Sequence, residues 1–189
     1  VTIQKSPIDQ QMDLDLELTI PASLTTSREG RSRERGRLPI HCTLTLIKGV
    51  PRLDILTEVE NHATDHRLRV HFPVPFKAQS ASYDGHFEVV QRQVDQAQGD
   101  ATWIEQPRPE VPQRLFTDLS DGAKGFLLAV RGLPESAVLH PSPASTELAL
   151  TLLRCVGSLS RDDLTTRKGH AGPYIATPGA QMPGKHAFN

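Results

Sequence analysis

Alternation of apolar and polar side chains is the feature of this sequence that most limits how the chain can fold. Between Asp13 and Ile20 every second residue is apolar, namely Leu14, Leu16 and Leu18. Neighbouring side chains on a strand point to opposite faces, so a period of two is typical of an antiparallel strand with one buried face. The apolar spacing that would indicate amphipathic helices does not recur along the chain. The sequence therefore predicts an all-β fold.

Further strand patterns follow along the chain, with turn residues between them. Three of them are close enough in sequence to predict a β-meander: Leu38–Lys48, Arg52–Glu60 and His66–Phe72. Asp121-Gly122 separates two apolar runs and predicts a hairpin. A short strand is expected at Trp103-Ile104, and a proline-rich loop is expected over Gly132–Ser145.

Glu147–Val156 carries apolar residues on both of its faces, which indicates a central strand that is covered on both sides. Altogether about nine strands recur at regular spacing, and this pattern is typical of an antiparallel β-sandwich. We expect one β-sandwich domain over residues 1–189. We also expect this domain to be a fragment of a larger protein with several domains.

The last part of the chain lacks the alternation. Gly157–Phe188 carries charge, glycine and proline but little that could form a core, so it is expected to be irregular and held by ion pairs. The candidate site residues lie in this segment: Arg161, Asp162, Asp163 and His170. Three interpretations of them stay open. They pin the segment to the sandwich or to another domain, they contact a ligand, or the adjacent carboxylates Asp162 and Asp163 take part in catalysis.

Composition argues against several classes of partner and site. The net charge is −1, and two glutamates interrupt the arginine cluster Arg28–Arg37, so no nucleic-acid partner is expected. No apolar run approaches about 18 residues, so no membrane partner is expected. Two cysteines, Cys42 and Cys155, do not make a disulfide framework and favour a reducing, cytoplasmic setting. His62 and His66 join two strands rather than share a helix face, so no metal site is expected there.

Three long runs resemble the C-terminal β-domain of glycoside hydrolase family 38, the α-mannosidases, in its bacterial branch. They are, in order, Arg52–Val74, Pro112–Glu135 and Leu148–Phe188. The resemblance implies a galactose-mutarotase-like supersandwich that forms part of a larger enzyme. It also implies retaining hydrolysis of α-mannosidic bonds by carboxylates and a zinc ion in an N-terminal catalytic domain. No catalytic residue, metal ligand or cofactor is therefore expected in this chain.

On this basis we expect a domain that is inactive alone, packs against its own N-terminal catalytic domain and completes the active-site wall. The four candidate residues would then lie at the rim, near an α-mannoside substrate, or at the surface between domains. Apolar surface should be exposed where partner domains pack. Assembly into a homo-oligomer stays open.

Two alternatives remain open at this point. A free-standing carbohydrate-binding module would stack sugar rings on aromatic side chains such as Trp103, although aromatic residues make up only 5% of the chain. A mutarotase-like enzyme on the same fold would need a facing histidine and glutamate, for which His71 and Glu88 are the candidates.

Overall fold

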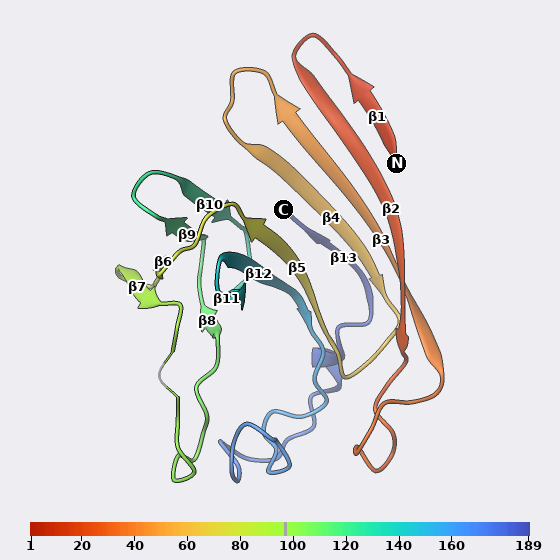
Figure 1. Ribbon diagram of the computed structural model, residues 1–189. Helices are drawn as coiled ribbons and strands as arrows, with labels where there is room; N and C mark the ends of the chain where they lie inside the picture. The colour runs from red at the N-terminus through yellow and green to blue at the C-terminus, as the bar shows by residue number, and fades with distance from the viewer. Residues whose placement is uncertain (97) are drawn as a thin grey trace. The chain divides into compact units, whose positions relative to one another are not determined.

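The computed structural model describes residues 1–96 and 98–189, and strands make up most of the described chain (Figure 1). All of the strand pairs whose register is given below are antiparallel, which confirms the predicted all-β fold. One turn of 3-10 helix, η1, covers Pro178–Gln181. No helix within the described residues has the length and apolar character needed to span a membrane.

The strands belong to two compact units of the chain. Unit 1 comprises Val1–His66, Arg154–Gly157 and Thr177–Asn189. Unit 2 comprises Arg67–Leu153 and Ser158–Ala176. The single domain predicted over residues 1–189 stays a prediction.

Unit 1 contains a five-stranded sheet in the order β1-β2-β3-β4-β13. Its strands are β1 (Thr2–Lys5), β2 (Asp9–Pro21), β3 (Arg35–Ile47), β4 (Leu53–Asn61) and β13 (Gly184–Phe188). In Figure 1 the long ribbons of β2, β3 and β4 run side by side. β2, β3 and β4 correspond to strands that the alternation predicts, with ends shifted by a few residues.

The register of this sheet gathers apolar side chains on one face. Leu16 pairs with Ile40, and Ile40 pairs with Val59. Leu38 and Val59 are buried, whereas Leu16 is 52% exposed. The apolar residues of the same sheet that are exposed include Leu16, Leu18, Leu46 and Leu53. Unit 1 therefore carries exposed apolar surface, as the resemblance leads us to expect.

Unit 2 contains two four-stranded sheets. The first has the order β10-β9-β6-β7, formed by Gly125–Ala129, Phe116–Ser120, Ser80–Asp84 and Val89–Gln93. The second has the order β5-β12-β11-β8, formed by Arg67–Val74, Ser145–Arg154, Glu135–Ser142 and Glu110–Pro112. β12 lies inside its sheet and is buried along most of its length, which confirms the predicted central strand.

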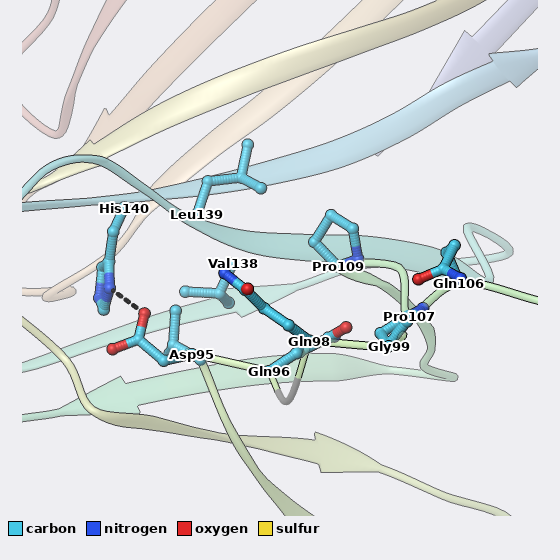
Figure 2. Close-up of a pocket in the computed structure, with 11 residues that line it drawn as sticks. Asp95, Gln96, Gln98, Gly99, Gln106, Pro107, Pro109, Val138, Leu139 and His140 are labelled. Carbon is cyan, nitrogen blue, oxygen red and sulfur yellow. Dashed lines mark hydrogen bonds and ion pairs between the residues drawn. The ribbon is translucent and has the colours of Figure 1, made fainter. Parts of the chain in front are cut away.

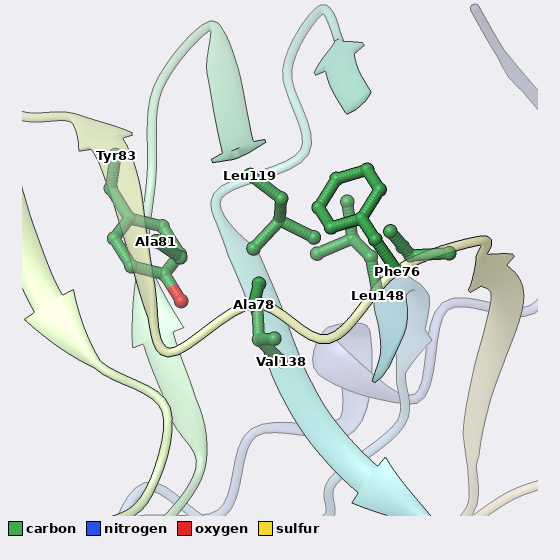
Figure 3. Close-up of a cluster of buried hydrophobic side chains, with 8 residues drawn as sticks. Phe76, Ala78, Ala81, Tyr83, Leu119, Val138 and Leu148 are labelled. Atoms are coloured by element: carbon green, nitrogen blue, oxygen red, sulfur yellow. The ribbon is translucent and has the colours of Figure 1, made fainter. Parts of the chain in front are cut away.

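One cluster of buried side chains joins the two sheets of unit 2 (Figure 3). Tyr83 and Leu119 come from the first sheet, and Val138 and Leu148 come from the second. Burial raises the pKa of the Tyr83 hydroxyl to about 12. Two sheets that share one apolar core form a β-sandwich, as predicted.

The predicted β-meander is wrong in its third strand. β5 lies beside β12, and the edge of β4 is taken by β13, where Val59 pairs with His186. Asp65, which precedes β5, has a φ of 54° in the left-handed region, which is typical of a residue in a turn. Alternation identifies the strands but carries no information about which strand pairs with which.

Three other local predictions are also wrong. Glu135–Ser142, expected within a proline-rich loop, is strand β11. Trp103 and Ile104 form no strand, and their neighbour Glu105 makes an isolated bridge with Arg167. Gly184–Phe188, expected to be irregular, is the edge strand β13. Prolines near its ends hide β11 in the sequence, and β13 is too short to show a clear period.

A buried asparagine ties the end of β4 to the C-terminal part of unit 1. Asn61 is 1% exposed. Its Nδ2 donates to the carbonyl oxygens of Gln181 at 3.1 Å and Met182 at 2.8 Å. Its Oδ1 accepts from the backbone N–H of Ala63 at 3.0 Å, and Cys155 Sγ lies 3.4 Å from Nδ2. One amide thus provides hydrogen bonds to three segments of unit 1.

Further hydrogen bonds surround Asn61. The backbone N–H of Cys155 donates to the carbonyl of His66 at 2.8 Å. Gln181 Oε1 accepts from the backbone N–H of Asp65 at 2.8 Å, and Gln181 Nε2 donates to Asp65 Oδ1 at 2.8 Å. Arg31 from the arginine cluster donates to the carbonyl of Asp65 at 2.5 Å. We call Asn61, Asp65, His66, Cys155 and Gln181 the Asn61 network.

We predict that Asn61→Ala lowers the free energy of unfolding by about 2–4 kcal/mol, because each buried backbone group that loses its partner costs about 1–3 kcal/mol. Urea denaturation measures the change. His62→Ala is the matched control: His62 is the exposed neighbour, and its substitution should stay within about 0.5 kcal/mol. A loss below about 1 kcal/mol for Asn61→Ala would mean that the network is dispensable.

A second prediction concerns pH. Burial lowers the pKa of His66 below its ordinary value of about 6.5. As pH falls below about 6.5 the unfolded chain binds a proton at this position while the folded chain does not, so stability decreases. His66→Gln should therefore lose less stability than the unsubstituted chain between about pH 7.5 and about pH 5.5.

This comparison also removes the opposite contribution of His41. Its hydrogen bond to Asp15 raises the pKa of His41, which favours folding at low pH equally in both proteins. Urea denaturation at the two pH values gives the four free energies. An unchanged pH dependence in His66→Gln would contradict the prediction.

Candidate functional site

The candidate residues lie on a segment of unit 2, Ser158–Ala176, whose two ends are paired. Ser158 and Ala176 form an isolated antiparallel bridge. The backbone N–H of Leu159 donates to the carbonyl of Ile175 at 2.8 Å. We call Ser158–Ala176 the closed loop, because this pairing holds its ends together.

A serine organises the inside of the closed loop. Ser160 is buried, and its hydroxyl oxygen accepts from the backbone N–H groups of Ala171 at 3.1 Å and Gly172 at 3.2 Å. These two bonds hold Ala171 and Gly172, in the second half of the loop, against Ser160, which directly precedes Arg161. The loop therefore has a defined conformation although it contains no regular secondary structure.

Arg161 makes a bidentate ion pair within the loop. Its Nε and Nη2 donate to the two carboxylate oxygens of Asp163, each at 2.6 Å. Its guanidinium carbon lies 5.5 Å from the centre of the Tyr174 ring, in cation–π geometry. The hydrogen bond to Asp163 raises the pKa of the Arg161 guanidinium further above its usual range. Arg161 is thus charged and fixed on both sides.

Asp162 points to a different partner from its neighbour Asp163. Asp162 Oδ2 lies 3.6 Å from His170 Nε2, and both side chains are more exposed than that of Arg161. The four candidate residues therefore form two separate pairs, and the adjacent carboxylates do not act as one group. Both pairs lie within the closed loop.

Other residues attach the closed loop to the rest of unit 2. Arg167 Nη1 donates to Glu105 Oε2 at 2.6 Å, and the two residues also form a backbone bridge. Lys168 Nζ donates to the carbonyl of Ala101 at 2.6 Å. The backbone N–H of Gln106 donates to the carbonyl of Thr166 at 3.0 Å. The loop is thus pinned, and Arg167 rather than Arg161 makes the ion pair that pins it.

A hollow of about 700 Å³ lies next to this attachment (Figure 2). On one side of it, Asp95 Oδ1 lies 3.0 Å from His140 Nδ1, and His140 Nε2 lies 2.9 Å from the carbonyl of Ala78. Both neighbours of the imidazole are acceptors, so both ring nitrogens donate when His140 is protonated. The sequence offers no sign of this pair, because His140 falls in the predicted loop and Asp95 lies 45 positions earlier.

The other histidines of interest have separate partners. His62 Nε2 lies 3.4 Å from Glu60, whereas His66 Nε2 faces Cys155 Sγ at 3.8 Å, so the two rings do not converge. A mutarotase-like site would need His71 to face Glu88. Instead, His71 pairs with Glu147 at 2.5 Å. Within the described residues no three histidine, cysteine, aspartate or glutamate side chains are grouped to hold a metal ion. Both cysteines are free thiols.

Comparison with known proteins agrees with the fold. The model of the glycosyl hydrolases family 38 C-terminal domain matches residues 2–163. This match covers more than half of the chain and includes the start of the closed loop. The chain belongs to glycosyl hydrolase family 38, as its C-terminal domain.

Individual proteins that resemble this chain also carry the names of family 38 enzymes or of related hydrolases. A putative mannosylglycerate hydrolase of Halalkalibacterium halodurans is 33% identical over 132 residues, which cover 70% of this chain and 14% of that protein. The crystal structure of an α-mannosidase from Enterococcus faecalis V583 has a TM-score of 0.79 at 30% identity, over 99% of this chain and 21% of that chain. A family 38 glycosyl hydrolase structure from Enterococcus faecalis has a TM-score of 0.79 at 27% identity, with the same coverage. The chain spans about a fifth or less of these proteins.

We predict that Arg161→Lys loosens the closed loop, because an ammonium group cannot donate to both oxygens of Asp163 in the planar geometry of a guanidinium. Hydrogen–deuterium exchange of the amides between Ser160 and Tyr174 should become roughly three to ten times faster, with little change in global unfolding. Arg131→Lys, at an exposed arginine of unit 2 outside the loop, is the control. Equal exchange in Arg161→Lys and the unsubstituted chain would contradict this role.

Proposed function

We propose that this chain is the non-catalytic C-terminal part of a retaining, zinc-dependent α-mannosidase, in which it completes the active-site wall. The observation that carries the proposal is the coverage of the comparisons. Nearly the whole chain aligns with a family 38 α-mannosidase, yet it accounts for 21% of that enzyme. The remaining length is available for the residues that cleave the glycosidic bond.

The ion pairs of the closed loop support a non-catalytic role. Retaining glycosidases place two carboxyl groups about 5–5.5 Å apart, on either side of the bond that is broken. Asp162 and Asp163 are neighbours in sequence, and Asp163 is held by two hydrogen bonds from Arg161. A carboxylate in a bidentate pair with arginine is a poor proton donor, since its charged form is stabilised.

The proposal gives the closed loop one of two positions in the parent enzyme. Arg161, Asp162, Asp163 and His170 lie either at the rim near the substrate or at the surface that meets the N-terminal catalytic domain. The exposed apolar residues of unit 1 would provide further contact area for that domain. In this proposal the loop has one defined conformation, so its polar side chains are already in position and little conformational entropy is lost when the catalytic domain or the substrate binds.

The substrate we propose is an α-mannoside. The Halalkalibacterium halodurans relative is named a putative mannosylglycerate hydrolase, which makes short mannosides with an acidic aglycone the first compounds to test. The zinc ion that the family resemblance implies would bind in the catalytic part and contact the sugar there. A reducing cytoplasmic setting, in which Cys42 and Cys155 stay thiols, belongs to the same proposal.

An assay of the chain alone tests this proposal. We expect no hydrolysis of an aryl α-mannoside above the protein-free blank, with or without added zinc, because the bond-cleaving groups lie in the rest of the enzyme. Release of the aryl alcohol is followed by absorbance, and circular dichroism checks that the chain is folded. Zinc-dependent turnover by the folded chain would refute the non-catalytic role.

A further inference from the structure

A second hollow, of about 740 Å³, lies in unit 2 beside the segment that anchors the closed loop. Its lining comes from the end of β7, from Asp95 and Gln96 after it, from the segment 103–108 and from β8. Trp103, Gln96, Gln106 and Arg108 are the side chains that matter for its chemistry. We call it the Trp103 hollow. Its volume falls within the range of about 300–1,000 Å³ that small-molecule sites occupy.

The indole of Trp103 is held at the edge of this hollow with much of its surface exposed. Trp103 is the only tryptophan of the chain, and it is 45% exposed. The Gln106 amide and the ring both lie close to Gly99, where an added Cβ would come within 2.5 Å of Gln106 Oε1, 3.0 Å of the indole and 3.1 Å of Pro107. Glycine therefore lets the backbone support the ring. A supported, exposed indole offers a flat apolar surface with little loss of conformational entropy on binding.

Two glutamine amides near the indole are already oriented by hydrogen bonds. Gln96 Nε2 donates to the carbonyl of Arg108 at 2.5 Å, and Gln106 Nε2 donates to the carbonyl of Asp100 at 3.1 Å. An amide has two N–H donors and one carbonyl acceptor, so each group has capacity beyond these bonds. Groups that both donate and accept match hydroxyls, which do the same.

The lining of the hollow contains both acidic and basic side chains. Glu105 is paired with Arg167 at 2.6 Å, and Glu110 is paired with Arg67 at 2.8 Å. Asp95 lies 3.0 Å from His140 Nδ1. Glu105 and Glu110 thus each have an arginine partner, and two further arginines, Arg92 and Arg108, line the hollow. Hydroxyl groups can accept hydrogen bonds from both the amides and the guanidinium groups of this lining, so a ligand rich in hydroxyls fits it.

We propose that the Trp103 hollow binds a neutral pyranose unit of a glycan, with one apolar face of the sugar ring on the indole and its hydroxyls on the two amides. A pyranose combines a face of C–H groups with a rim of hydroxyls, and these are the two surfaces that the hollow provides. This inference goes beyond the proposed function and does not depend on it, because the hollow is formed by residues of unit 2 alone.

Titration of the unsubstituted chain with mannobiose tests the proposal. Isothermal calorimetry should give a Kd on the order of 1 mM, and the fluorescence of Trp103 should change with the same midpoint. Trp103→Ala should weaken binding at least about tenfold, which corresponds to 1.4 kcal/mol. Phe87→Ala is the matched control, since Phe87 is an aromatic residue of unit 2 with 102% exposure that lies outside the hollow.

A second variant tests the role of the amides. Gln106→Leu keeps the size of the side chain but removes its donors and acceptor, and it should also weaken binding while the unfolding temperature changes little. Absence of binding at about 20 mM mannobiose overturns the proposal, as does equal affinity in Trp103→Ala and the unsubstituted chain. A chain that binds mannobiose but hydrolyses an aryl mannoside would keep this inference and reject the non-catalytic role.

Discussion

The side-chain amide of Asn61 is the interaction on which the arrangement of unit 1 depends most. It bonds two consecutive carbonyls of the C-terminal segment, Gln181 and Met182, at the point where β4 ends. β13 then returns along β4 as the edge strand of the sheet. In unit 1 the backbone N–H of Thr177 donates to the carbonyl of Gly157 at 3.0 Å, so the chain leaves and re-enters this unit at adjacent points. Without these anchors a long irregular excursion would have large conformational freedom to lose.

The closed loop carries the candidate functional residues, and other interactions hold it in place. Its own conformation comes from Ser160 and from the bidentate pair of Arg161 with Asp163, and its attachment within unit 2 comes from Arg167 and Glu105. The loop is fixed by the pairing of its two ends, by hydrogen bonds within it and by its ion pair to Glu105. Such a loop can present charged groups in a constant position. This property suits a wall that a catalytic domain packs against, and it does not require the loop to perform chemistry itself.

The sequence predicts strands well and their partners poorly. Leu14, Leu16 and Leu18 identify β2 because one face of a sheet repeats every second residue. The position of β13 beside β4 could not be foreseen, since it depends on Asn61 reaching residues 120 positions later. In the candidate site the residue types were found but their pairing was not: Asp162 and Asp163 are adjacent, yet they have different partners. The hydrogen bond between Asp95 and His140 and the support of Trp103 by Gly99 arise only from tertiary packing, which local patterns do not encode.

We propose that this domain contributes to an α-mannosidase by completing it. The most direct measurement is α-mannoside hydrolysis by the parent enzyme from which the region of this chain has been removed, before and after the purified chain is added back. We expect little activity from the truncated enzyme and recovery that saturates with the concentration of added chain. Full activity of the truncated enzyme without the added chain, with unchanged kcat and KM, would contradict it.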